Sequence, residues 1–209
     1  MATVHHTNPA QLPLDQQLTR LRAILSTNKT LVTVLERVAT LNLPNWYLAA
    51  GAVSQTIWNH VSEMAPDTGI SDYDVVYHDD GDLSWDAEDA HIRRARALFS
   101  DMPGVEIEIR NQARVHLWYE SKYGVKCAPH ASVEAGIDSW ISTTAMIGIR
   151  PDEDGGCSWS VYAPRGLSDY FNMIARPNAV LGLKEDYDKK AARWKGIWAK
   201  LTVEPWPAK

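Results

Sequence analysis

The chain has 209 residues, of which 45% are hydrophobic, and a formal net charge of -5. This size and composition fit one domain with a buried core and leave room for only a small appendage. The negative charge excludes a protein attracted to nucleic acid by its overall charge, and the absence of a long apolar run excludes a membrane-spanning helix.

Charge is distributed unevenly along the chain. Residues 165–209 contain nine Lys or Arg and five Asp or Glu, so the acidic excess lies in residues 1–164. An acidic body with a basic tail suits a carboxylate site whose polyanionic substrate is partly held by the C-terminal segment. A solvated helix face explains the same charges, and we expect Lys189, Lys190 and Arg193 to face water.

The cysteine content and the N-terminal sequence bear on the cellular compartment. Cys127 and Cys157 lack the spacing of a zinc site and are too few for a disulfide scaffold, which favours a reducing compartment. The N-terminus shows no positively charged start followed by an apolar stretch. We therefore expect a cytoplasmic protein with no membrane partner.

The first half of the chain predicts helices followed by an alternation of strands and helices. Apolar residues keep helical spacing at positions 14, 18, 21 and 25 and again at 31, 34, 35 and 38. Residues 1–45 are therefore expected to form a helical segment packed on the core. We predict strands over residues 46–49, 72–78 and 105–109, and helices over residues 52–64 and 84–99.

The second half predicts a hairpin and further helices. Residues 143–150 and 158–162 flank a polar, Gly-containing turn over residues 151–156, which is typical of a β-hairpin. Residues 111–123 fit either a strand or a helix. Helices are predicted over residues 132–140, 167–174 and 185–200. The expected fold is α+β (mixed α/β), a mixed sheet flanked by helices, with residues 46–165 as the core and 1–45 and 166–209 as helical segments of the same domain.

Two carboxylates one residue apart are the strongest chemical signal. Asp72 and Asp74 open a predicted strand, and alternate strand residues share a face, so both point the same way. Paired carboxylates of this kind suit Mg²⁺. The small-residue turn at Gly51 leads into a helix, whose free N–H groups can meet a phosphate. The combination predicts a site for a metal-bound nucleotide.

The next strand supplies a third carboxylate. Glu106 and Glu108 alternate with isoleucines and therefore share a face. If this strand lies beside the strand of Asp72 and Asp74, one of the two glutamates can complete the group. Three carboxylates can hold two metal ions, which clamp a triphosphate during an in-line displacement.

The order of these elements resembles the polymerase β-like nucleotidyltransferase superfamily. That superfamily has a Gly-Gly or Gly-Ser turn, a helix, an Asp-x-Asp or Asp-x-Glu strand, and one later carboxylate. The chain departs from this pattern, because Gly51 is followed by Ala52 and the serine, Ser54, stands two residues later. Carried over by motif, Gly51, Ala52 and Ser54 are the expected phosphate contacts.

Longer stretches are similar to a bacterial nucleotidyltransferase-like family formerly classed as a domain of unknown function. In that match Glu108, just ahead of Asn111, corresponds better to the third carboxylate, and Glu106 is the second choice. The similar stretches cover most of the chain from residue 46 onward, namely residues 46–58, 69–77, 82–89, 111–119, 138–150, 161–177 and 189–205.

The resemblance implies a nucleotidyltransferase fold and a Mg²⁺-dependent transfer of a nucleoside monophosphate from an NTP, with release of pyrophosphate. Asp72, Asp74 and Glu108 are then the catalytic and metal-binding residues for two Mg²⁺ ions. The acceptor is left open between a small molecule, a protein and an RNA. A catalytically inactive nucleotide-binding or interaction protein on the same fold, such as an antitoxin or a sensor, is the alternative.

Two hypotheses of equal weight describe the roles of Arg114 and His116. If their segment is extended, both side chains share a face near the metal site, where Arg114 can bind a phosphate and His116 can pair with a phosphate or position an acceptor. In the other hypothesis, Arg114 makes a structural ion pair and His116 is a core residue.

Overall fold

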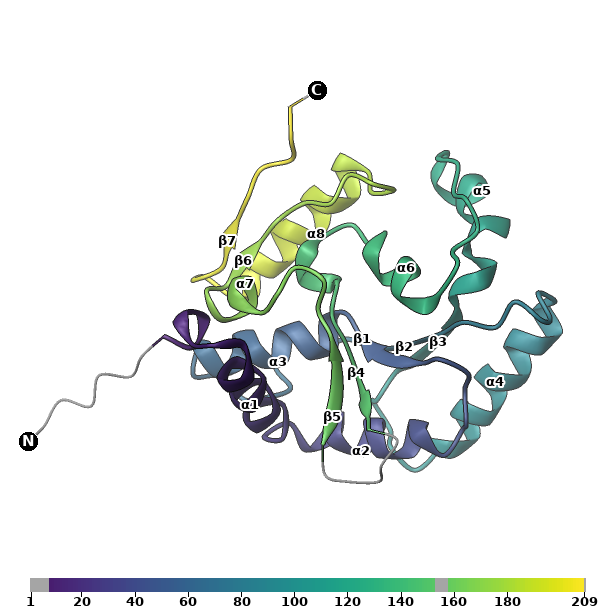
Figure 1. Cartoon of the computed structure of the whole chain (residues 1–209), viewed down its shortest axis with the longest axis horizontal. Helices are drawn as coiled ribbons and strands as arrows, with labels where there is room; N and C mark the ends of the chain where they lie inside the picture. Colours follow the sequence, from purple (N-terminus) through teal and green to yellow (C-terminus); the bar gives the residue numbers. More distant parts are fainter. Residues whose placement is uncertain (1–7, 153–157, 209) are drawn as a thin grey trace, which may run out of the picture.

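The computed structural model describes residues 8–152 and 158–208. Its centre is a five-stranded sheet in the order β3-β2-β1-β4-β5 (Figure 1). The five strands are β1 (Tyr47–Ala49), β2 (Tyr73–Tyr77), β3 (Ile107–Asn111), β4 (Gly148–Pro151) and β5 (Trp159–Tyr162). All three strands that carry the sequence motifs are neighbours in this sheet.

The sheet is mixed, as the sequence predicts. β2 and β3 pair in parallel, whereas the β1·β2, β1·β4 and β4·β5 pairs are antiparallel. The predicted hairpin is present as β4 and β5, with Pro151 opposite Trp159, and residues 153–156 of its turn lie outside the described residues. The α+β fold class is therefore confirmed, although β3 begins two residues later than predicted.

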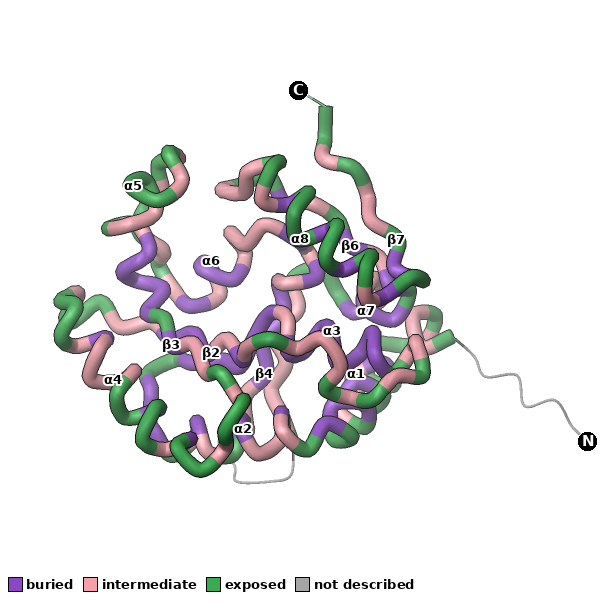
Figure 2. Tube along the Cα trace, turned by 180° about the vertical axis from the view of Figure 1, so that it is seen from behind, coloured by how far each residue is buried: buried purple, intermediate pink, exposed green. Residues whose placement is uncertain are grey.

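The N-terminal helices supply one side of the main core. Helices α1 (Leu14–Leu25) and α2 (Lys29–Ala39) bury one face each in the core, α1 against α3 and α2 against the sheet (Figure 2). Asn28 joins the two helices: its side-chain oxygen caps Leu31 N–H at 3.0 Å, and its amide donates to Thr56 Oγ1 at 2.9 Å. The second bond ties the helical segment to α3 (Gly51–Val61).

Helix α4 (Trp85–Leu98) connects β2 to β3, as a parallel pair requires. Its Glu88 is buried and accepts hydrogen bonds from Asn111 N–H at 2.8 Å and from the Arg114 guanidinium. Both partners belong to the end of β3 and the turn that follows it. This buried carboxylate therefore fixes where β3 ends.

The C-terminal helix α8 (Lys184–Ile197) packs on α3 through indole rings. Trp58 lies against Trp198 with ring centroids 5.2 Å apart, and Trp198 Nε1 donates to Asn59 Oδ1 at 2.7 Å. Aromatic pairs of this tilted kind add stability beyond the burial of their area. The packing holds α8 above the sheet, on the opposite side from α2 (Figure 1).

The remaining elements are short. They are η1 (Pro9–Gln11), η2 (Gln112–Leu117), α5 (Tyr119–Tyr123), α6 (Val133–Asp138), η3 (Thr143–Ala145), α7 (Ser168–Phe171), β6 (Ile174–Ala175) and β7 (Thr202–Val203). β6 and β7 form a separate two-stranded parallel sheet beneath the C-terminal segment. The segment 111–123 that fitted either a strand or a helix is therefore mainly helical after β3.

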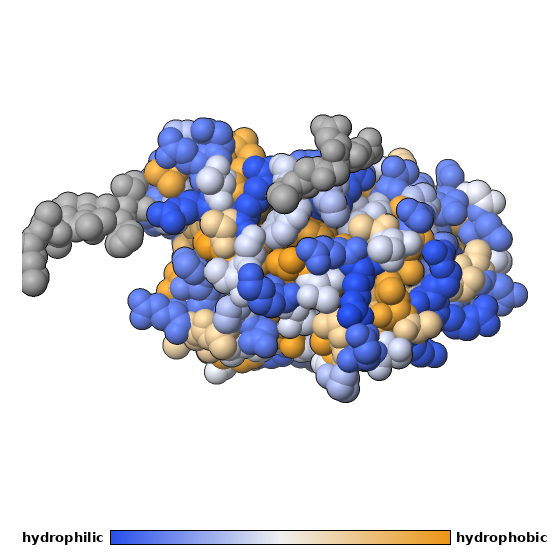
Figure 3. Space-filling view, turned by 90° about the horizontal axis from the view of Figure 1, so that it is seen from below, coloured by the Kyte–Doolittle hydropathy of each residue, from blue (hydrophilic) through white to orange (hydrophobic). Residues whose placement is uncertain are grey.

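The surface is mixed in character. Seen from below, hydrophobic residues form separate patches that hydrophilic residues border (Figure 3). Within the described part of the chain, no helix has both the length and the apolar character needed to cross a membrane.

The buried ion pair of Glu88 predicts a large stability effect. Replacing Glu88 with Ala leaves Arg114 and the N–H of Asn111 without their partner, and breaking such a pair costs about 3–5 kcal/mol. We expect a loss of this size in the free energy of unfolding from urea denaturation. Asp86→Ala, in the same helical turn but exposed, is the control and should cost no more than about 1 kcal/mol. Equal losses in the two variants would contradict the assignment.

Candidate active site

Strand register brings two of the predicted carboxylates together. Asp74 of β2 lies opposite Glu108 of β3 and opposite Ala49 of β1. Neighbouring strands lie about 4.8 Å apart, so these three residues form one row across the same face of the sheet. Asp72 and Glu106 both precede the paired residues, because β2 begins at Tyr73 and β3 at Ile107, and Glu106 lies outside the cavity described next. The register therefore favours Glu108 as the third carboxylate.

Asp72, Asp74 and Glu108 line one cavity of about 360 Å³. Burial, followed by the charges of Asp72 and Glu108, raises the pKa of Asp74 from 3.8 to about 7. Lys190 and Arg110 act in the opposite direction. The charged form of Asp74 is thus disfavoured first by burial and then by its acidic neighbours, and a bound cation would relieve both effects.

The predicted phosphate turn borders the same cavity. Ala50, Gly51 and Ser54 line it, and Ala50 caps the N-terminus of α3 with φ 55° and ψ −130°. The first N–H groups of a helix have no partner within it, so that of Gly51 can meet a ligand, whereas Ala52 is fully buried and lines neither this cavity nor the one that adjoins it. The Ser54 hydroxyl is engaged differently, since it donates to the Ala50 carbonyl at 3.3 Å.

Gln55 is a site residue that the sequence did not reveal. Its side chain is buried and lines the carboxylate cavity, and its Oε1 has no hydrogen-bond partner among the described residues. Buried polar atoms are normally paired, so an unpaired amide on a cavity wall fits a polar ligand group. No sequence motif surrounds Gln55 that would have indicated this role.

The C-terminal helix contributes positive charge to the cavity. Lys190 and Arg193 of α8 both line it, and both are exposed, as the sequence predicts. Arg193 also donates to the Gly69 carbonyl at 2.8 Å and to the hydroxyl of Ser71, which precedes the aspartates. The basic excess of residues 165–209 was the sequence signal for this arrangement.

A second cavity of about 560 Å³ adjoins the first and shares Asp74, Glu108 and Lys190 with it. Its lining includes four aromatic residues, and residues of α5 and of α8 contribute to it, so we call it the aromatic cavity (Figure 1). Gln112 is buried in its lining with an Oε1 that has no partner in the described part of the chain. The aromatic lining residues are Trp118, Tyr119, Tyr123 and Trp140.

Arg114 and His116 lie on a 3₁₀ helix, η2, and not on an extended segment. Arg114 is buried in the ion pair with Glu88, and its Nε donates to the Leu83 carbonyl at 2.9 Å. His116 is half-buried, and neither residue lines the two cavities that contain Asp74. The geometry therefore favours the structural ion pair over the phosphate contact for Arg114.

The carboxylates suit a divalent cation in their chemistry, but not as a preformed cage. Across residues 8–152 and 158–208, no three His, Cys, Asp or Glu side chains are placed to hold a metal ion by themselves. Glu108 is turned to Arg110, with 3.6 Å between Glu108 Oε2 and Arg110 Nη2, and both side chains are substantially exposed. Mg²⁺ commonly takes one or two carboxylates and completes its shell with substrate phosphates, so Asp72 and Asp74 fit it.

Comparison with known families agrees with this geometry. A family model described as nucleotidyltransferase matches residues 36–203. The chain belongs to this nucleotidyltransferase family. The matched region contains β1, α3, β2 and β3 and extends through α8, so it includes every element that lines the two cavities.

A solved structure shows the same fold. An NMR structure described as revealing a CCA-adding enzyme head domain aligns with a TM-score of 0.71, covering 95% of this nucleotidyltransferase and 100% of that chain at 23% sequence identity. This likeness confirms the predicted nucleotidyltransferase-like fold, and the family match confirms the predicted nucleotidyltransferase family. No curated protein matches the chain significantly.

The raised pKa of Asp74 makes the stability of the metal-free nucleotidyltransferase depend on pH. The folded protein keeps the Asp74 proton up to about pH 7, whereas the unfolded chain releases it near the ordinary value of 3.8. The contribution of Asp74 to the free energy of unfolding is therefore complete below about pH 4 and is lost as the pH rises through about 7. Urea denaturation in a chelating buffer measures this fall.

Other groups titrate over the same range, so the comparison between variants carries the test. Asp74→Asn should flatten the fall in the free energy of unfolding, whereas Asp80→Asn, at an exposed position outside the cavity, should leave it unchanged. A fall of equal size in the Asp74→Asn variant and in the original protein would show that Asp74 does not titrate abnormally.

Proposed function

We propose that this chain is a Mg²⁺-dependent enzyme that transfers a nucleoside monophosphate from an NTP to a hydroxyl-bearing acceptor and releases pyrophosphate. One observation carries the proposal: Asp74 lies opposite Glu108 in the sheet, and Asp72 and the N-terminus of α3 line the same cavity. Family membership supports nucleotidyl transfer as the reaction class.

Asp72 and Asp74 would hold the metal. When bound, Mg²⁺ supplies positive charge that offsets the charge of the phosphates and polarises the phosphoryl group under attack. The raised pKa of Asp74 is consistent with this assignment, because burial and, after it, the charges of Asp72 and Glu108 disfavour the unaccompanied carboxylate, and a cation would offset both.

The triphosphate is assigned to the smaller cavity. The Gly51 N–H at the start of α3 would meet its oxygens, since a helix N-terminus favours negative charge. Lys190 and Arg193 line the same cavity from α8 and add positive charge. Gln55 also lines this cavity, and its unpaired Oε1 can accept a hydrogen bond or contact a cation, whereas only its Nε2 can donate to a phosphate.

The nucleoside is assigned to the aromatic cavity. A base can stack on the rings of Trp118, Tyr119 or Trp140, and such stacking is worth about 1–3 kcal/mol per base. Gln112 offers an unpaired amide for the polar edge of the base. Because the two cavities share Asp74 and Lys190, a nucleotide spanning both would have its α-phosphate at the carboxylates.

Transfer then proceeds by a single displacement. The acceptor hydroxyl oxygen attacks the α-phosphorus, and Glu108 takes the hydroxyl proton. A bond forms between the acceptor oxygen and the α-phosphorus, the bond from the α-phosphorus to the bridging oxygen breaks, and pyrophosphate leaves with the electron pair. Glu108 is free to turn toward the acceptor because its pairing with Arg110 is exposed and weak.

The same pairing also supports the alternative of a non-enzymatic nucleotide-binding protein. If Glu108 stays with Arg110 when nucleotide is bound, the site retains Asp72 and Asp74 for the metal but lacks a group to accept the proton. Binding of an NTP without transfer to any acceptor, unchanged by Glu108→Gln, would favour this alternative.

The first test measures NTP binding with and without Mg²⁺ in the original protein and in the Asp72→Asn/Asp74→Asn variant. We expect Mg²⁺-dependent binding that the variant loses, since the amides keep the shape of the carboxylates but not their charge. The fold should survive, because the substitution removes mutual repulsion. Calorimetry measures the binding, and circular dichroism checks the fold.

Asp80→Asn is the matched control, because it changes the charge by the same amount at an exposed position. Undiminished Mg²⁺-dependent binding by the double variant would place the nucleotide elsewhere and overturn the proposed site. Failure of the well-folded original protein to bind any NTP would remove the support for nucleotidyl transfer.

The role of α8 gives a second test. Lys190→Ala removes a charged donor to the phosphates, worth about 1.5–3 kcal/mol, which corresponds to an increase of about 10–100-fold in Kd for the NTP. Lys200→Ala, exposed and outside both cavities, should leave the Kd unchanged. Calorimetry with each NTP provides the Kd values, and an equal effect of the two substitutions would reduce the role of Lys190 to general charge.

A further inference from the structure

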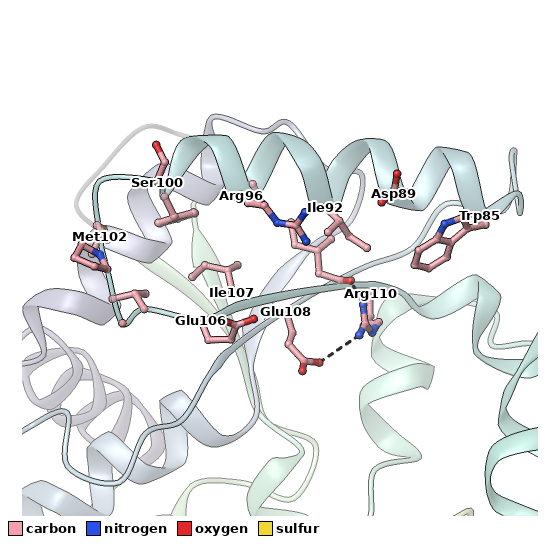
Figure 4. Close-up of a pocket in the computed structure, with 16 residues that line it drawn as sticks. Trp85, Asp89, Ile92, Arg96, Ser100, Met102, Glu106, Ile107, Glu108 and Arg110 are labelled. Atoms are coloured by element: carbon pink, nitrogen blue, oxygen red, sulfur yellow. Dashed lines mark hydrogen bonds and ion pairs between the residues drawn. The ribbon is translucent and has the colours of Figure 1, made fainter.

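A groove of about 520 Å³ runs along the outer side of β3, between that strand and α4 (Figure 4). β3 is the last strand of the sheet and pairs only with β2 among the described residues. Its outer edge is therefore unpaired by a strand and is accessible at its N-terminal end, where Ile107 is half-buried; such an edge is a template for pairing with an additional chain.

The hydrogen bonds identify which backbone groups face outward. Tyr73 N–H donates to the Glu106 carbonyl at 2.9 Å, so the even-numbered residues of β3 turn their backbone toward β2. The odd-numbered residues turn theirs away: Asn111 N–H is taken by Glu88, and the Ile109 carbonyl by Arg110 at 3.1 Å. The N–H and carbonyl of Ile107, which is half-buried, are left for a docking strand, whereas Ile109 is 1% exposed and its N–H must be uncovered before it can pair.

Glu108 links this groove to the active site. It lines the groove, the carboxylate cavity and the aromatic cavity. In Figure 4 the Ile107 side chain points toward α4, whereas Glu108 and Arg110 point away from it. A strand added beside β3 would continue the row of Ala49, Asp74 and Glu108, and its residue opposite Glu108 would lie about 4.8 Å away on the same face.

We propose that the acceptor is an extended protein segment that adds to the open edge of β3 and presents a Ser, Thr or Tyr hydroxyl to Glu108. This inference rests on the proposed function. The hydroxyl oxygen forms the new bond to the α-phosphorus, Glu108 receives its proton, and pyrophosphate is the leaving group.

The charges of the groove favour a protein over a nucleic acid. Its lining contains Asp89, Glu106 and Glu108 against Arg96 and Arg110, so it lacks the basic stripe that a phosphodiester backbone requires. The rest of the lining is mostly apolar and suits alternate side chains of an extended peptide. These apolar residues include Ile92, Ala95, Phe99, Met102, Val105 and Ile107.

The test uses a short peptide of alternating valine and serine with a lysine at each end, and its match with alanine in place of serine. Both peptides should shift the amide NMR signals of Ile107 and Ile109 and leave those of Val75, in the sheet interior, unchanged. With Mg²⁺ and α-labelled NTP, only the serine peptide should become labelled.

Two substitutions on the groove test the docking mode. Ile107→Pro removes an outward N–H that the β2 pairing does not use, and proline is tolerated at such edge positions. It should weaken peptide binding and labelling at least about tenfold. Ile107→Val keeps the N–H and should behave like the original protein. NTP binding should be unchanged in both.

A second pair of substitutions keeps the test valid if the proline disturbs the structure of β3. Arg96→Trp fills the groove from α4, whereas Arg93→Trp places the same side chain on the exposed side of that helix. Only Arg96→Trp should reduce peptide binding, again at least about tenfold.

Three outcomes would overturn the docking proposal. The first is absence of peptide binding, and the second is peptide binding that neither Ile107→Pro nor Arg96→Trp reduces. The third is labelling of a single-stranded oligoadenylate in preference to the serine peptide. In each of these cases, Mg²⁺-dependent NTP binding that is lost in Asp72→Asn/Asp74→Asn would leave the proposed function intact. Loss of NTP binding in the original protein would instead reject the proposed function itself.

Discussion

The site depends on the parallel, in-register pairing of β2 with β3. A parallel pair needs a crossover, which α4 provides, and Glu88 of that helix fixes the end of β3 through Asn111 and Arg114. The register that results sets Asp74 opposite Glu108. Like charges directly opposite each other in a sheet are destabilising. This register therefore lowers the stability of the sheet at Asp74 and Glu108, and a bound cation would restore that stability.

The second constraint is the attachment of the C-terminal helix. The packing of Trp58 on Trp198 and the hydrogen bond from Trp198 to Asn59 hold α8 above the sheet. This position brings Lys190 to the carboxylates, where it opposes their mutual repulsion. Residues more than a hundred positions apart in the chain therefore form one electrostatic unit, with the acids on the sheet and the bases on α8.

The parts of the site that follow a local rule were predictable from the sequence. Strand alternation places Asp72 and Asp74 on one face, and alternation in the next strand supplies Glu108. The choice between Glu106 and Glu108 needed the register of the sheet. The contribution of Gln55 could not be predicted, because it depends on which helix face is covered by distant segments, and the basic excess of residues 165–209 indicated a role for the tail without identifying Lys190. The identity of the Arg114 partner could not be predicted for the same reason, because Glu88 lies on another helix.

One wall of the carboxylate cavity is an indole. Trp194 is buried, lines the cavity beside Lys190 and Arg193, and meets Trp58 edge to face with ring centroids 5.8 Å apart. Indole emission responds to nearby charge and to local polarity. A triphosphate entering this cavity would therefore change the light that the protein itself emits, and the chain carries an intrinsic optical reporter at the position where its chemistry is expected.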